Sequence, residues 1–170
     1  INMHEPGKET LLLRSGMGSG KTTRICEYLA GLPESISILC IGYRRVLNSA
    51  LAEKFGLLDY QVATPEQLCM ATRVCVQVDS LPRLLAPTSS GSPQDRSLRA
   101  VYDVVVVDEV ESTLDHFAAD TLGPKVLVCW KIFQIVVQRA TKVILADADA
   151  HHRAMAVLKE LRLQSDKSSV

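Results

Sequence analysis

The chain has 170 residues, the usual length of one domain, and its 19 Lys and Arg residues balance 19 Asp and Glu residues. A neutral total excludes proteins that wrap nucleic acid with a strongly basic surface, although a local basic rim is compatible with it. No apolar run approaches the ~20 residues of a membrane-spanning helix, which excludes an integral membrane protein. The 5 cysteines are scattered and lack a C-x-x-C spacing, so we expect a reducing compartment and neither a disulfide framework nor a zinc site.

Short runs rich in Val, Ile and Leu alternate along the chain with stretches of helical spacing. Continuous apolar runs are typical of strands buried on both faces, as in parallel sheets. In chain order the pattern predicts a strand at Thr10–Arg14, a helix at Lys21–Ala30, a strand at Ile36–Gly42, a helix at Arg45–Phe55, strands at Arg73–Val78 and Tyr102–Asp108, a helix at Pro124–Ala140, a strand at Lys142–Ala146 and a helix at His151–Leu163. This order predicts an α/β fold, a doubly wound, mostly parallel sheet with helices on both faces.

The chain is expected to divide into one domain and a short tail. Residues 1–163 would form the domain, with the Ser- and Pro-rich stretch 86–99 as an unusually long surface loop. The polar residues 164–170 would be a tail or the start of a linker. Because the chain begins with Ile1 and has no leader pattern, we expect it to be a segment of a longer protein.

A Gly-rich loop connects the first predicted strand to the first predicted helix. It consists of Ser15, Gly16, Met17, Gly18, Ser19, Gly20, Lys21, Thr22 and Thr23. Glycines let several backbone N–H groups point at phosphate oxygens, and the following helix adds its positive end. Lys21 would reach the β- and γ-phosphates and the Thr22 hydroxyl would hold Mg²⁺, which predicts a nucleotide site. The generic pattern has Gly where this chain has Ser15, and the alternative is a Gly-rich turn that caps a helix, with Lys21 in solvent.

Two adjacent carboxylates, Asp108 and Glu109, lie at the end of a predicted strand, where ligands bind in open α/β sheets. In nucleotide hydrolases such a strand delivers an Asp to the metal shell, and the neighbouring Glu polarises the attacking water. We therefore assign catalytic roles to Asp108, Glu109 and Lys21. The expected metal ligands are Thr22 and Asp108. The alternative is that both acids only end the strand and cap a helix that starts near Glu111.

These segments resemble superfamily 2 helicases, and among them the origin-of-replication binding protein helicases of the herpesvirus type. The loop is similar to the family's Ser-x-Met-Gly-(Ser/Thr)-Gly-Lys-Thr pattern, with Gly16 where herpesviral members usually have Pro. The family's Asp-Glu-x-Glu pattern is matched by Asp108, Glu109 and Glu111. Residues 41–47, 76–84 and 145–149 resemble three further family motifs, so the resemblance extends over almost the whole chain.

The resemblance implies a RecA-like P-loop NTPase fold and the first motor domain of a DNA helicase that acts in replication. ATP and Mg²⁺ would be its cofactors and single-stranded or forked DNA its partner, with RNA left open. A second RecA-like domain of the parent chain would supply arginines to the ATP site, and replication proteins and a nuclear location would fit the role. Residues 1–170 alone are expected to bind Mg·ATP weakly, to hydrolyse it poorly and not to unwind a duplex.

Four residues that follow predicted strands are candidates for contact with a nucleic-acid strand: Arg44, Arg45, Ser80 and Arg83. Their positions place them at the edge of the sheet along which the resemblance implies that the strand passes. The alternatives are a solvated first helical turn for the first two arginines and an N-cap for Ser80. Asp147 and Asp149 follow another strand, and we favour a role in coupling the acidic site to the strand path over capping of the helix near His151.

Other residues carry weaker signals. His151 and His152 could ligate a metal beside the acids, but a solvated helix start is the better interpretation. Trp130 fits the core of a helix better than a base-stacking platform. The segment Thr64–Leu68 superficially resembles a helicase motif and equally suits a plain first turn of a helix.

Two other functions remain open from the sequence. A small P-loop kinase would need a lid and an acceptor pocket with several arginines, and the stretch 86–99 is a poor lid. A nucleotide-gated, non-catalytic scaffold is the second alternative.

Overall fold

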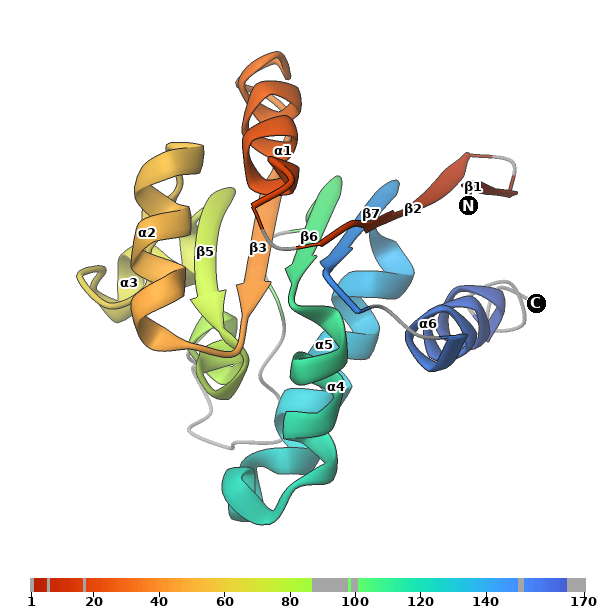
Figure 1. Cartoon of the computed structure of the whole chain (residues 1–170). Helices are drawn as coiled ribbons and strands as arrows, with labels where there is room; N and C mark the ends of the chain where they lie inside the picture. Colours follow the sequence, from red (N-terminus) through yellow and green to blue (C-terminus); the bar gives the residue numbers. More distant parts are fainter. Residues whose placement is uncertain are drawn as a thin grey trace.

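The computed structural model describes residues 2–5, 7–16, 18–86, 98, 101–149 and 152–164, and strands and helices alternate through them (Figure 1). The strands are β1 (Asn2–Glu5), β2 (Lys8–Arg14), β3 (Ile38–Gly42), β4 (Leu58–Asp59), β5 (Arg73–Gln77), β6 (Val104–Asp108) and β7 (Lys142–Asp147). The α-helices are α1 (Lys21–Ala30), α2 (Arg45–Phe55), α3 (Pro65–Met70), α4 (Val110–Ala118), α5 (Val126–Arg139) and α6 (His152–Gln164). Two 3-10 helices are η1 (Val78–Leu84) and η3 (Asp120–Lys125). No helix within these ranges has the length and apolar character to cross a membrane.

One sheet joins all seven strands in the order β1-β2-β7-β6-β3-β5-β4. β1 pairs with β2 in the antiparallel sense. The other six strands, β2, β7, β6, β3, β5 and β4 in their order across the sheet, are parallel to one another. The predicted mostly parallel α/β sheet is therefore confirmed, and it is consistent with the RecA-like fold that the resemblance implies. Parallel pairing brings the carboxyl ends of β2, β7, β6, β3 and β5 to one edge of the sheet, which is where the candidate site lies.

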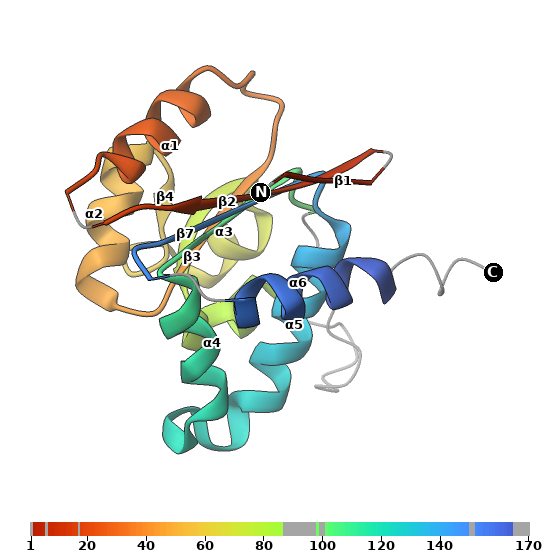
Figure 2. The same ribbon diagram turned by 45° about the vertical axis from the view of Figure 1, so that its right-hand side comes forward.

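Helices cover both faces of the sheet, as predicted (Figure 2). α1 and α2 pack on one face over alternate residues of the central strands, such as Cys40, Val106 and Ile144. The residues between them face the other side, where α4, α5 and α6 pack together with α3 and η1 around Phe133 and Leu158. The central strands are buried on both faces, which explains why they are continuous apolar runs in the sequence.

The predicted elements differ from the observed ones mainly at their ends. β3 begins at Ile38 and not at Ile36, because the Ser37 amide and hydroxyl both donate to the Asp103 carboxylate, at 2.8 and 2.7 Å. β5 ends at Gln77, since Val78 begins η1. α5 begins at Val126, after the 3-10 turn that contains Pro124. The helices α1 and α2 have the predicted bounds.

Two predicted features fall largely outside the described residues. In the stretch 86–99, only Ala86 and Leu98 are described, and Leu98 pairs with Leu85 across an isolated antiparallel bridge. Of the expected tail 164–170, only Gln164 is described, as the last residue of α6. The surface loop and the tail thus stay predictions.

Candidate functional site

The strand order brings the Gly-rich loop and the acidic residues to one edge of the sheet. β7 lies between β2 and β6, with Arg14 opposite Asp147 and Ala146 opposite Asp108. The loop leaves β2 directly after Arg14, while Asp108 and Asp147 end the next two strands. Segments that are more than 80 residues apart in the sequence therefore meet at one place.

The Lys21 side chain folds back onto the Gly-rich loop. The Lys21 ammonium donates to the Ser15 carbonyl and, at 3.1 Å, to the Gly16 carbonyl, so its side chain bends back over the loop and is half-buried. The Ser15 hydroxyl hydrogen-bonds with that of Ser19, and the Ser15 amide donates to the Asp147 carbonyl at 3.4 Å. The alternative in which Lys21 extends into solvent does not describe this conformation.

The glycines of the loop adopt a backbone that other residues avoid. Gly18 and Gly20 have φ of +75° and +82°, in the left-handed region. Gly20 is the N-cap of α1, and no side chain in the described part of the loop caps the helix start. Its first amides are therefore open to an anion. Met17 lies outside the described residues.

The two threonines lie in the first turn of α1. Thr22 is half-buried, whereas Thr23 is exposed and its hydroxyl accepts a hydrogen bond from Lys54 of α2 at 3.2 Å. Thr22, the expected metal ligand, follows directly after Lys21, so both belong to the same turn at the carboxyl edge.

Asp108 lies in an environment that disfavours its charge. Burial, together with the neighbouring negative charges of Glu109 and Asp147, raises the pKa of its carboxyl to about 6. The backbone amide of Glu109 and the positive charge of Lys21 oppose this shift of the pKa. The pairing of β2 with β7 and of β7 with β6 places the loop that carries Lys21 and the end of β6 at the same edge of the sheet.

Glu109 has an unusual backbone conformation. Its φ of 48° and ψ of 57° make it the one non-glycine residue with positive φ in the described part of the chain. It is the N-cap residue of α4, yet its own side chain does not cap the helix. Such a conformation costs of order 1–3 kcal/mol and persists only where neighbouring contacts hold it.

Asp147 supplies the cap that Glu109 does not. Asp147 as a whole is 9% exposed, and its carboxylate accepts hydrogen bonds from the amides of Glu111 and Asp149, each at 2.9 Å. Asp147 therefore caps the start of α4. Residues 150 and 151, where the helix of the alternative would begin, lie outside the described residues. Asp149 itself is exposed and contributes its backbone amide.

The candidate nucleic-acid contacts lie further along the same edge, in the segments that follow β3 and β5 in the sequence. Arg44 and Arg45 are exposed at the start of α2, and the Arg44 guanidinium lies 5.0 Å from the centre of the Tyr43 ring. The Gln77 side chain donates to the Tyr43 carbonyl at 2.9 Å and joins the two strand ends.

Ser80 and Arg83 both lie within η1. Ser80 is not the N-cap of that helix, which is Gln77, because the turn begins earlier than expected. The Arg83 guanidinium donates to the carbonyls of Tyr60 and Ala63, at 2.8 and 3.2 Å. Arg83 therefore holds the segment before α3, although it is exposed like Arg44 and Arg45.

Two of the weaker signals have structural roles. Thr64 and Gln67 form a capping box at the start of α3, as a plain first turn predicts. Trp130 is half-buried and packs against Phe117 and Phe133, with ring centres 5.0 and 5.6 Å apart. His151 and the side chain of His152 lie outside what the structure describes.

Some contacts near the site could not be foreseen from the sequence. Arg153, at the start of α6, pairs with Glu111 and Asp115 of α4 at 3.1 and 2.7 Å. His116 of α4 pairs with Asp79 of η1 at 2.6 Å. The partners are 37 or more residues apart, and no local pattern marks them.

The comparison with known proteins decides the family. The family model described as origin of replication binding protein matches residues 2–168. The chain belongs to the origin of replication binding protein family. This identification confirms the family that the sequence motifs resemble.

Relatives in this family come from several viruses. The replication origin-binding protein of Psittacid herpesvirus 1 is 32% identical over 165 residues, which cover 91% of this chain and 18% of the relative. That of Human herpesvirus 6A is 30% identical over 86% of this chain and 17% of the relative. A protein of Acanthamoeba polyphaga mimivirus, with "helicase" in its name, is 28% identical over 90% of this chain and 15% of its own length. The chain thus spans less than a fifth of each of these relatives.

Proposed function

We propose that this chain is the ATP-binding first motor domain of a superfamily 2 DNA helicase of the replication origin-binding type. It would couple ATP hydrolysis to movement along single-stranded DNA and to duplex unwinding, together with a second RecA-like domain. The observation that carries the proposal is that the Gly-rich loop follows β2, while Asp147 and Asp108 end the two adjacent strands β7 and β6, at the same edge of the sheet. Family membership and a relative named as a helicase support it.

The residues of the site fit a bound nucleotide. The amides at the start of α1 have no side-chain cap among the described residues, and the Lys21 ammonium is held by two loop carbonyls that phosphate oxygens can replace as acceptors. Lys21 would neutralise charge on the β- and γ-phosphates. The positive φ of Gly18 and Gly20 allows the backbone to curl around such an anion.

The residues also fit Mg²⁺. Burial and the nearby negative charges of Glu109 and Asp147 raise the pKa of Asp108, and a divalent cation would balance those charges. Thr22 and Asp108 would hold the ion together with phosphate oxygens, because Mg²⁺ in nucleotide sites uses only one or two carboxylates. When bound, it supplies positive charge to the phosphoryl group under attack.

Glu109 is the proposed base that orients the attacking water. It directly follows Asp108, and the cap that Asp147 provides to α4 fixes the peptide that follows it. Removal of a positioned general base typically slows a reaction 10²–10⁴-fold, so Glu109→Gln should abolish most hydrolysis and leave Mg·ATP binding intact.

The test measures phosphate release from γ-labelled ATP in single-turnover mixtures, with and without single-stranded DNA. We expect slow release that DNA stimulates and that Glu109→Gln lowers at least about 10²-fold. Glu27→Gln, an exposed change on α1, is the control. Transfer of the label to a nucleoside without DNA stimulation would favour a kinase, and equal behaviour of the Glu109 and Glu27 variants would favour a non-catalytic scaffold.

A further inference from the structure

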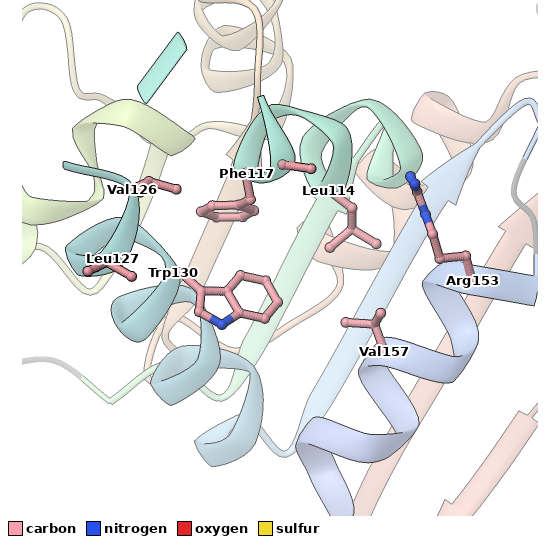
Figure 3. Close-up of a pocket in the computed structure, with 8 residues that line it drawn as sticks. Leu114, Phe117, Val126, Leu127, Trp130, Arg153 and Val157 are labelled. Atoms are coloured by element: carbon pink, nitrogen blue, oxygen red, sulfur yellow. The ribbon is translucent and has the colours of Figure 1, made fainter. Parts of the chain in front are cut away.

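Arg153 joins the first turn of α6 to the first two turns of α4, beside the acidic residues. Its Nη2 atom contacts the Glu111 carboxylate at 3.1 Å, the Asp115 carboxylate at 2.7 Å and the Glu111 carbonyl at 3.4 Å. In Figure 3 the Arg153 side chain reaches from α6 toward α4, at the rim of a cavity of about 400 Å³. The cavity is lined mainly by apolar residues of α4, α5 and α6.

The two carboxylates that pair with Arg153 differ in how far they are exposed to water. The Asp115 side chain is 65% exposed, so water screens its pairing with Arg153, which then contributes little. The Glu111 side chain is only 13% exposed, so water screens its pairing with the half-exposed Arg153 less than it screens the pairing with Asp115. The contact that matters is therefore the one with Glu111, at the turn where α4 begins.

That turn determines the position of Glu109. Glu109 is two residues before Glu111, and its positive φ requires neighbouring contacts to hold it. The described contacts on the turn come from three sides. Asp147 accepts from the Glu111 amide, the Thr113 hydroxyl donates to the Asp108 carbonyl at 3.3 Å, and Arg153 binds the Glu111 side chain and carbonyl.

We propose that Arg153 is a positioning residue for ATP hydrolysis: by clamping α6 onto Glu111, it holds the start of α4 so that the Glu109 carboxylate stays aligned for the attacking water. This inference rests on the proposed function. Arg153 touches none of the reacting groups and acts through Glu111. Its loss should therefore slow hydrolysis without weakening nucleotide binding, because the Gly-rich loop proposed to bind phosphate follows β2 and not β6.

The first experiment measures amide hydrogen exchange at residues 109–113 in the 170-residue chain without nucleotide. Arg153→Met removes the charge and keeps an unbranched stem over the cavity, so packing there changes little. We expect exchange in this segment to rise about 10-fold in Arg153→Met, to rise less in Arg153→Lys, and to stay unchanged in α5. Lys159→Met, on the exposed face of the same helix, is the control and should match the wild type.

The second experiment separates rate from affinity. Arg153→Met should lower the single-turnover rate of ATP hydrolysis by about 10-fold, while the Kd for Mg·ATP changes by less than about twofold. Arg153→Lys should recover part of the rate. Exchange in Arg153→Met equal to that in Lys159→Met would overturn the clamp, and a loss of rate matched by an equal rise in Kd would overturn the positioning role.

A failure of the proposed function would look different. In that case Lys21→Ala would leave nucleotide binding and hydrolysis as they are in the wild type, while the exchange experiment, which needs no nucleotide, would still report on the clamp. The positioning role would then be refuted together with the proposed function, and the contact would remain as a clamp at a helix start.

Discussion

Asp147 caps helix α4 through Glu111: its Oδ2 atom accepts a hydrogen bond from the Glu111 amide at 2.9 Å. The same carboxylate accepts from the Asp149 amide, so one buried side chain fixes the end of β7 to the start of the helix after β6. The acidic residues of two adjacent strands are thereby joined.

Loss of this cap should destabilise the domain. Asp147→Ala leaves the Glu111 amide without its acceptor, which should lower the free energy of unfolding by about 1–2 kcal/mol. Asp147→Asn keeps one oxygen acceptor and should lose less. Urea denaturation at pH 7 measures both, and Asp149→Ala, which keeps its backbone amide, is the control. An unchanged midpoint in Asp147→Ala would refute the role of the cap.

The raised pKa of Asp108 predicts that the free energy of unfolding depends on pH. Its pKa is about 6 in the folded chain and 3.8 ordinarily, so between pH 4 and 6 the folded chain binds a proton that the unfolded chain releases. This group's contribution to stability therefore falls as the pH rises through that window, by up to about 3 kcal/mol. Asp108→Asn should match the wild type near pH 4 and be the more stable protein at pH 8. Thermal unfolding at both pH values tests this, and a stability difference that does not depend on pH would contradict it.

The sequence was informative where a pattern is local. The parallel sheet follows from continuous apolar runs such as Val104–Asp108, and α1 and α2 have their predicted bounds because apolar spacing and a following Gly define them. The short strands β1 and β4 were not predicted. β1 is a polar strand at the sheet edge and β4 has two residues, too few for a periodic pattern.

Side-chain partners were harder to predict than elements. The sequence placed Asp147 near the acidic site, but which helix it caps depends on β7 lying between β2 and β6. Arg153 has its partner Glu111 on a helix 42 residues earlier, and only the packing of α6 on α4 brings them together. Such contacts follow from the tertiary arrangement, which no local pattern encodes.

The capping box of α3 should have a measurable effect on stability. Thr64→Ala removes the acceptor for the Gln67 amide and should lower the free energy of unfolding by about 1 kcal/mol. Thr72→Ala, at an exposed position before β5, is the matched control. Chemical denaturation of the two variants measures the difference, and an equal effect would mean that the cap adds nothing.

The arginines at the carboxyl edge should differ in what their loss changes: DNA binding for Arg44 and Arg45, and stability for Arg83. Arg44→Ala with Arg45→Ala should weaken binding to single-stranded DNA and reduce the slope of log K against log salt by about 1.4, with stability unchanged. Arg83→Ala should instead lower stability, because the Tyr60 and Ala63 carbonyls lose their donor. Fluorescence anisotropy over a salt series, with thermal unfolding of each variant, tests both expectations. An unchanged salt slope in the double variant would remove these two residues from the strand path.

The most direct test of the nucleotide site is a calorimetric titration of the 170-residue chain with ATP, with and without Mg²⁺. We predict binding that requires Mg²⁺ and that Lys21→Ala weakens at least about 10-fold. Lys131→Ala, an exposed change on α5, should bind as the wild type does. Equal affinity of the Lys21 and Lys131 variants, or binding that ignores Mg²⁺, would contradict the account.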